Sequence, residues 1–227
     1  YGLQKVPHAN GDAELSFFPQ TMQNPKIKNL LFDLGGVIVD IERDNCVEAF
    51  ARLGLPDAES YFGLYAQSGI FMGIEDGSVS VDEFHSHLRE KLPHGTGDSE
   101  IDQAFQKFIT GIPTHRLQTL ERLRSQGYRL YLLSNTNPIM WHGILASEFA
   151  KLGKRREDYF DGMVTSFEAK AAKPDAQIFH YTCRALGIVP EETLFFDDSE
   201  ANTSAAAALG FNTALVAPGT EFTAYLP

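Results

Sequence analysis

The chain has 227 residues, of which 43% are hydrophobic, enough for a core domain carrying one smaller insertion. Its 19 basic and 30 acidic residues give a formal net charge of −11, which argues against a nucleic-acid or anionic-membrane partner. No apolar stretch reaches 18 residues and no basic flank precedes an apolar run at the start, so we expect neither a membrane span nor a signal peptide.

The two cysteines, Cys46 and Cys183, lie far apart and do not have the spacing of metal ligands. We therefore expect two buried free thiols rather than a disulfide framework. Free thiols are typical of a reducing compartment, so the sequence predicts a soluble cytoplasmic protein.

The N-terminal part divides into a polar extension and a first strand. Residues 1–25 are rich in turn formers, and we expect an extension to which no function is assigned. Leu30 to Phe32 form a short apolar run that predicts a buried strand. The strand ends on Asp33, and Gly35 and Gly36 follow in a turn. A carboxylate at the end of a parallel strand can face a ligand, although by itself it can equally cap the turn.

The next part of the chain has the apolar spacing of helices. Four helices are expected, beginning near Asp44, residue 57, Ser80 and Ser99. We expect no strand between Asp44 and Gly111. The acidic turn Glu75-Asp76-Gly77 lacks the ligand spacing of a calcium-binding loop. These features predict a helical insertion over residues 42–112.

From Thr114 onward, helical segments alternate with apolar runs. The expected helices are 114–127, 138–151, 174–186 and 201–209, and the expected strands are 128–133, 163–165, 193–196 and 212–216. This alternation predicts an α/β fold with a parallel sheet that is covered by helices on both faces. The core domain would comprise residues 26–41 and 113–227.

Polar residues at three strand ends and one helix start match one known pattern. They are Asp33, Ser134 with Asn135, Lys173 before Pro174, and Asp197 with Asp198. In this order they resemble the motifs of the haloacid dehalogenase-like hydrolase superfamily over roughly residues 27–217. The Asp-Leu-Gly opening is similar to that of a branch of sugar-phosphate phosphatases. The resemblance implies a Rossmann-like core with the helical insertion as a cap domain.

The resemblance also implies a role for each motif residue. Asp33 would be the nucleophile that forms an aspartyl-phosphate, and Lys173 would hold both this nucleophile and the phosphoryl group. Ser134, Asn135 and Gly36 would bind the substrate phosphate. The residues implied to bind one Mg²⁺ are Asp33, the carbonyl of Gly35, and Asp198, with Asp197 acting through water or from behind the other ligands. Asn202 would be a weaker supporting group.

Each of these residues taken singly can be an ordinary turn or cap residue. Adjacent carboxylates after a buried strand, however, need a neutralising charge, which a metal supplies. Three further residues lie near the motifs. Arg43 and Asp40 can contact a ligand or form a salt bridge, and Trp141 is expected to pack in the core rather than line the pocket.

Gly35 departs from the family pattern. The family's phosphatases usually have a second Asp two residues after the nucleophile, which acts as general acid and then as general base. Losing a general acid typically costs about 10² to 10⁴ in rate. A phosphatase with Gly35 would need a good leaving group, or a proton donor from the cap or from water. The alternatives are a 2-haloacid dehalogenase-type hydrolase and a non-catalytic binding or scaffold protein.

The paired carboxylates decide between these alternatives. Halide displacement needs no divalent cation, so it leaves Asp197 and Asp198 unexplained, and a scaffold predicts decay of the motifs, which are intact. The sequence therefore predicts a Mg²⁺-dependent phosphatase of a small phosphorylated metabolite, with a sugar phosphate favoured by the resemblance. A phosphotransferase or mutase using the same intermediate stays open, as does the oligomeric state.

Overall fold

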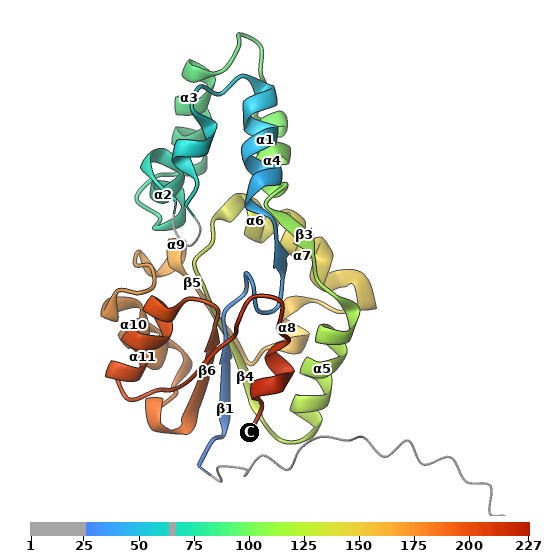
Figure 1. Cartoon of the computed structure of the whole chain (residues 1–227), viewed down its shortest axis with the longest axis vertical. Helices are drawn as coiled ribbons and strands as arrows, with labels where there is room; N and C mark the ends of the chain where they lie inside the picture. The colour runs from blue at the N-terminus through green and yellow to red at the C-terminus, as the bar shows by residue number, and fades with distance from the viewer. Residues whose placement is uncertain (1–25, 64–66) are drawn as a thin grey trace, which may run out of the picture.

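The computed structural model describes residues 26–63 and 67–227. The predicted extension 1–25 lies outside the described residues, as do Leu64 and Tyr65 of the second predicted helix of the insertion. The described chain forms a sheet-based part from which a helical part rises (Figure 1).

The sheet-based part is built on five parallel strands in the order β5-β4-β1-β6-β7. The strands are β1 (Asn29–Phe32), β4 (Arg129–Ser134), β5 (Gly162–Thr165), β6 (Thr193–Asp197) and β7 (Asn212–Leu215). β1 is central, and its Phe32 is in register with Leu132 of β4 and Phe196 of β6. The predicted α/β fold is thus confirmed, and the carboxyl ends of all five strands meet at one edge.

Helices cover both faces of the sheet (Figure 1). One face carries α5 (Thr114–Ser125) and α8 (Arg156–Tyr159), and the other carries α10 (Ala176–Leu186) and α11 (Glu200–Ala208). Because side chains alternate along a strand, Leu30 and Phe32 belong to one apolar cluster and Leu31 to the other. None of the described helices is both long and apolar enough to cross a membrane.

The sheet-based part also contains short helices. They are α6 (Pro138–His142), α7 (Ile144–Phe149), α9 (Ser166–Ala169) and the 3₁₀ turns η2 (Ala150–Leu152), η3 (Pro190–Glu192) and η4 (Phe222–Tyr225). The single helix predicted for 138–151 is wrong, because Gly143 leaves the helical conformation at φ −90° and ψ −110° and divides it. The helix predicted from residue 174 begins at Ala176, capped by the Asp175 side chain.

The helical part contains α1 (Arg43–Leu53), η1 (Ala58–Tyr61), α2 (Gly69–Glu75), α3 (Val81–Lys91) and α4 (Asp98–Gln106). Its core is a group of phenylalanine rings, with Phe71 within 5.2 Å of Phe50, Phe62, Phe84 and Phe105 between ring centroids. The capping box of Ser80 and Glu83 is present as predicted. The second predicted helix is wrong: η1 is followed by a bridge between Phe62 and Gln67 before α2 begins, so its aromatic spacing reflects packing rather than one continuous helix.

Two short strands connect the helical part to the sheet. β2 (Asp40–Ile41) pairs antiparallel with β3 (Ile109–Gly111), so both connections run side by side. The expectation of no strand between Asp44 and Gly111 is therefore wrong at Ile109–Gly111. Strands this short have no periodicity of their own, and they exist only because the two connections meet in space.

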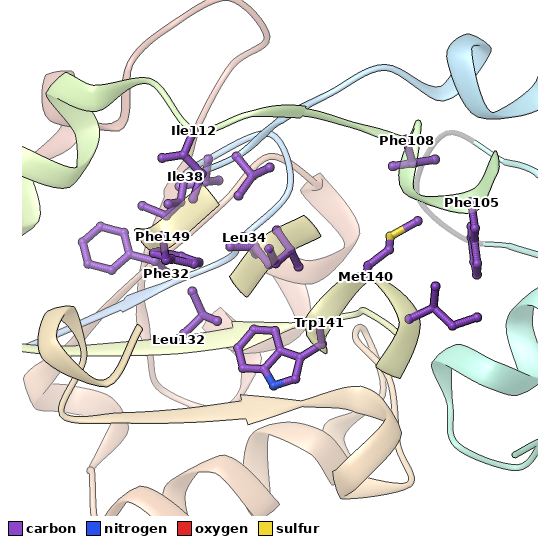
Figure 2. Close-up of a cluster of buried hydrophobic side chains, with 14 of the residues drawn as sticks. Phe32, Leu34, Ile38, Phe105, Phe108, Ile112, Leu132, Met140, Trp141 and Phe149 are labelled. Carbon is purple, nitrogen blue, oxygen red and sulfur yellow. The ribbon is translucent and has the colours of Figure 1, made fainter. Parts of the chain in front are cut away.

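The apolar core continues from the sheet to the helical part. Phe32, Leu132, Met140 and Phe108 all belong to one buried cluster. Figure 2 shows Met140 pointing toward Phe105 and Phe108, whereas the neighbouring Trp141 points the other way. Trp141 is buried and its ring lies 3.9 Å from the guanidinium carbon of Arg156, so it packs in the core as expected.

Both cysteines are free, as predicted. Cys46 of α1 is fully buried. The expected burial of the second thiol is wrong, since Cys183 of α10 is only partly buried. Its side chain packs at the margin of the cluster between α10 and the sheet, where the helix face meets solvent.

Candidate active site

The four predicted motif segments come together at the carboxyl edge of the sheet. Asp33 follows β1, Ser134 ends β4, Asp197 ends β6, and Lys173 precedes α10. The main chain continues the sheet pairing as far as Asp33, whose N–H donates to the carbonyl of Phe196 at 2.8 Å. One cavity at this edge is lined by Asp33, Gly35, Ser134, Asn135, Lys173 and Asp198, with Asn202 beside them.

Lys173 is the buried cation of this cavity. Its Nζ lies 2.7 Å from Asp33 Oδ1 and 2.7 Å from Asp197 Oδ2, and it donates to the carbonyl of Leu133 at 3.2 Å. Burial alone lowers the pKa of a lysine, but the charges of Asp197 and Asp33 outweigh it and raise the pKa of Lys173. The lysine is therefore charged and neutralises part of the acidic edge.

The carboxylates still outnumber this cation. Burial raises the pKa of Asp33 to about 7, and the charges of Asp197 and Asp198 add to it against the opposing effect of Lys173. Burial and the charge of Asp197 likewise raise the pKa of Asp198 to about 6. Asp33, Asp197 and Asp198 each offer an oxygen within 4.8 Å of the others. This compact all-oxygen set fits Mg²⁺, whose charge would favour the ionised carboxylates.

Asp197 differs from the other two carboxylates because its oxygens are already engaged. Oδ1 accepts from the Ser199 N–H at 2.9 Å, and Oδ2 accepts from Lys173 at 2.7 Å. The Asn202 amide donates to the two oxygens at 3.0 Å and 3.2 Å. Asp197 is thus held as a support for Lys173, while Asp33 and Asp198 have more free lone pairs for a metal.

The turn after β1 must be free of side chains where it approaches Asp198. Gly36 has φ +73°, and a Cβ at this position would lie 2.8 Å from Asp198 Cγ and closer still to its Oδ2. Gly35, by contrast, has room for a side chain, because among the described residues a Cβ there would meet only Ile41, at 3.5 and 3.6 Å. The absence of a carboxylate at residue 35 is therefore not imposed by space.

Ser134 and Asn135 lie at the same edge with different contacts. The Asn135 side chain accepts from Lys173 N–H and donates to Lys173 C=O, both at 2.9 Å, which fixes the backbone that carries the lysine. Among the described residues, the Ser134 hydroxyl has one long contact, 3.4 Å to the carbonyl of Asn135. Ser134 is therefore the better placed of the two to donate to a ligand in the cavity.

Other sequence candidates lie outside the cavity lining. Arg43 donates to the carbonyl of Phe62 at 2.7 Å and pairs with Asp44, and Asp40 pairs with Arg116 at 2.7 Å. Both residues therefore form salt bridges, the second of the two roles that the sequence left open for them. Trp141 is likewise absent from the described lining of the cavity.

The structure adds residues that sequence reasoning missed. Glu75 and Gln67 of the helical part line the cavity, together with Ile41, Phe108 and Ile109 of the connecting strands. No signal in the sequence singles out Glu75, because the sequence places it in an acidic turn and its position at the end of α2 is known only from the folded chain.

Comparison with known proteins gives consistent matches. The family model of haloacid dehalogenase-like hydrolases matches residues 27–210. D-ribitol-5-phosphate phosphatase of Bacteroides thetaiotaomicron is 40% identical over 187 residues, which cover 82% of this chain and 90% of the relative.

Two solved structures extend these matches to the fold. A wild-type haloacid dehalogenase family enzyme of the same bacterium, in complex with magnesium and inorganic phosphate, is 39% identical with a TM-score of 0.82, covering 88% of this chain and 100% of that one. A predicted haloacid dehalogenase-like hydrolase of Porphyromonas gingivalis is 31% identical with a TM-score of 0.80, covering 87% and 94%.

Proposed function

Because this chain belongs to the haloacid dehalogenase-like hydrolase family, we propose that it is a Mg²⁺-dependent phosphatase that hydrolyses the phosphate monoester of a small sugar alcohol. The observation that carries the proposal is the buried Asp33, held by Lys173 beside Asp198 in a chain 40% identical to a ribitol-5-phosphate phosphatase. The family and the phosphatase class predicted from the sequence are confirmed by these relatives, and Mg²⁺ is bound in a similar solved structure.

We assign the first chemical step to Asp33. One oxygen of its carboxylate attacks phosphorus, the bond from phosphorus to the ester oxygen breaks, and an aspartyl-phosphate forms. Water then attacks this intermediate and releases inorganic phosphate and the free carboxylate. Lys173 keeps Asp33 oriented from 2.7 Å away and offsets the negative charge of the phosphoryl group.

The metal would be held by Asp33, Asp198 and the main-chain carbonyl of Gly35, with Asp197 behind them. When bound, Mg²⁺ supplies positive charge that reduces repulsion between the nucleophile and the phosphate. Ser134 and the Asn135 N–H would donate to phosphoryl oxygens, and Gly36 lets the turn approach without a side chain. Because Asp197 already accepts hydrogen bonds from Lys173 and Asn202, these contacts support its assignment as a residue that does not bind the metal directly.

We further propose that residues 42–112 are a cap domain on a core of residues 26–41 and 113–227. The pairing of β2 with β3 supports boundaries next to these strands. Residues from both parts line the cavity, so the cap would exclude water from the phosphoryl transfer.

Phosphate release from a panel of monophosphates tests the function. The panel contains ribitol 5-phosphate, other polyol and sugar phosphates and nucleotides, each with Mg²⁺ and with chelator. We expect Mg²⁺-dependent turnover with a preference for polyol phosphates, abolished by Asp33→Asn. Asp82→Asn, which removes an exposed cap carboxylate, is the matched control and should retain full activity.

Two results would overturn the proposal. Turnover that persists in Asp33→Asn would exclude the aspartyl-phosphate route. Halide release from 2-chloropropionate, without phosphate release from any member of the panel, would instead favour the dehalogenase alternative.

A further inference from the structure

Gly35 leaves the proposed phosphatase without the usual proton donor beside its nucleophile. The described residues that line the cavity include four ionisable side chains: Asp33, Glu75, Lys173 and Asp198. Asp33 is the proposed nucleophile and Asp198 a proposed metal ligand. Lys173 is ion-paired with two carboxylates and carries a raised pKa, so it is a poor donor. Glu75 is the remaining acid.

The main chain around Glu75 is anchored to the core. The Ser166 hydroxyl of α9 lies 2.6 Å from the carbonyl of Glu75, and the N–H of Thr136 donates to that hydroxyl at 3.0 Å. Two residues further on, the carbonyl of Gly77 accepts from Lys170. These contacts attach the end of α2 to the loops after β4 and β5, at the edge where the nucleophile lies.

The close approach at Gly77 is part of this attachment. A Cβ at this residue would overlap the carbonyl oxygen of Phe167, and the positive φ of +71° also favours glycine. The turn that follows Glu75 therefore sits directly on α9. Glu75 is held over the cavity by the cap's own docking contacts rather than by a flexible loop.

The side chain of Glu75 is available for chemistry. Within the part of the chain that is described, its carboxyl group has no hydrogen bond and no ion pair. Burial, with a further effect of the Asp76 charge, raises the pKa of Glu75 to about 8. The raised pKa favours the protonated form of this partly buried side chain near neutral pH, the form that a general acid needs at the start of the reaction.

We propose that Glu75 of the cap is the general acid of the reaction, in place of the core carboxylate that is absent at Gly35. The inference rests on the proposed phosphatase function and names a further catalytic residue for it. It also makes cap docking a requirement for cleavage of esters with poor leaving groups, since the acid arrives with the cap.

The proton transfers balance over the two steps. As Asp33 attacks phosphorus, the electron pair of the breaking bond goes to the ester oxygen, which takes the proton of Glu75 and leaves as the alcohol. The Glu75 carboxylate then takes a proton from the water that attacks the aspartyl-phosphate. Asp33 leaves as a carboxylate, inorganic phosphate is released, and Glu75 is again protonated.

The dependence on the leaving group tests this role. Ribitol 5-phosphate and glycerol phosphate release a strongly basic alkoxide that needs a proton, whereas p-nitrophenyl phosphate releases a weakly basic phenolate that does not. We expect Glu75→Gln to lower kcat/KM for the alkyl phosphates by about 10² to 10⁴ and for p-nitrophenyl phosphate by only a few fold. Glu90→Gln, which neutralises an exposed carboxylate of α3 away from the cavity, should leave both rates unchanged.

A second variant separates loss of the acid from damage to the cap. Residue 35 has room for a side chain, so Gly35→Asp can restore a carboxyl group next to the nucleophile. In the Glu75→Gln background, this substitution should recover at least about tenfold of the lost rate on alkyl phosphates. It should change p-nitrophenyl phosphate hydrolysis little.

The outcomes distinguish the inference from the function on which it rests. Wild-type protein that hydrolyses none of the phosphates would overturn the proposed function and, with it, the role of Glu75. Active wild-type protein with an equal loss on both kinds of ester in Glu75→Gln, or with no loss, would overturn only the general-acid role. A Glu75→Gln defect that Gly35→Asp leaves unrepaired would also count against it.

Discussion

The ammonium group of Lys173 lies 2.7 Å from Asp33 Oδ1, in a site where the lysine side chain is 1% exposed and that of Asp33 is 12% exposed. The same nitrogen lies 2.7 Å from Asp197 Oδ2. One cation thus links the end of β1 to the end of β6 and holds the proposed nucleophile between them. Removing it would leave two buried carboxylates without this partner.

Lys173→Met should therefore affect stability as well as activity. Breaking a buried ion pair by removing one partner typically costs about 3–5 kcal/mol, because the remaining charge stays buried. We expect this loss in chemical denaturation at pH 8, together with loss of phosphate release. Lys154→Met, which removes an exposed lysine paired with Glu121, is the control and should unfold like wild type. Equal stability of Lys173→Met and wild type would contradict the ion-pair interpretation.

Gly36→Ala should weaken metal binding through Asp198. Its new Cβ would displace the Asp198 carboxylate, and we expect the Mg²⁺ concentration for half-maximal phosphate release to rise by about tenfold or more. Gly153→Ala is the matched control, because Gly153 has φ +72° and no atom of the described chain lies within 4 Å of its added Cβ. The control should lose about 1 kcal/mol of folding stability, because alanine disfavours a positive φ, but its Mg²⁺ dependence should not change. An unchanged Mg²⁺ dependence in Gly36→Ala would remove Asp198 from the proposed ligands.

Glu75→Gln should stabilise the protein at alkaline pH. The pKa of Glu75 rises from 4.5 to about 8 on folding, so the folded state binds the proton more tightly and stability falls as pH rises between these values. Glutamine does not ionise, so the variant does not lose stability in this way as pH rises. We expect the variant to gain on the order of a few kcal/mol over wild type at pH 8 and little at pH 4, measured by chemical denaturation with chelator present.

Glu90→Gln provides the comparison for this pH dependence, since Glu90 is exposed on α3. The stability difference between Glu90→Gln and wild type should stay flat between pH 4 and pH 8. A flat profile for Glu75→Gln as well would mean that the Glu75 carboxyl is not buried in solution.

Glu221→Gln should show the opposite pH dependence. Arg116 donates to both oxygens of Glu221, at 2.9 and 3.0 Å, and these hydrogen bonds lower the pKa of Glu221 in the folded protein. A lowered folded pKa gives stability that is present above the unfolded value near 4.5 and is lost as pH falls through the folded pKa. Because the Glu221 side chain is 39% exposed, we expect a loss of only about 0.5–1 kcal/mol at pH 7.

The loss in Glu221→Gln should shrink on acidification, which thermal denaturation at pH 7 and pH 3 can measure. Glu192→Gln, which breaks the exposed pair with Lys28, should change little at either pH. A constant loss at both pH values would assign the effect of Glu221→Gln to packing rather than to charge.

Much of the fold could be predicted because its determinants are local. Buried apolar runs, bounded by the caps and terminal glycines of the neighbouring helices, predicted the five strands of the sheet. The capping box predicted the start of α3. The failures have tertiary causes. Ile109–Gly111 becomes a strand only by pairing with Asp40–Ile41, and the helix expected over 138–151 breaks at Gly143.

The proposed site divides in the same way. Asp33, Ser134, Lys173 and Asp198 stand at strand ends or before a helix, where a parallel sheet brings residues distant in sequence to one edge. Their convergence at one edge could therefore be expected once a parallel sheet was predicted. Their individual contacts could not, and the engagement of Asp197 by Ser199, Lys173 and Asn202 appears only in the folded chain.

By itself, the sequence determined the parallel sheet and its helical insertion, because periodicity and caps are properties of short segments, and its motifs implied the phosphatase chemistry through their resemblance to a known family. Only the tertiary structure decided that Glu75 lines the cavity with Asp33, since this depends on how the end of α2 docks on α9. It also showed that residue 35 has space for the carboxylate it lacks. Contacts between separately folded layers are set by side-chain packing, which no local pattern encodes.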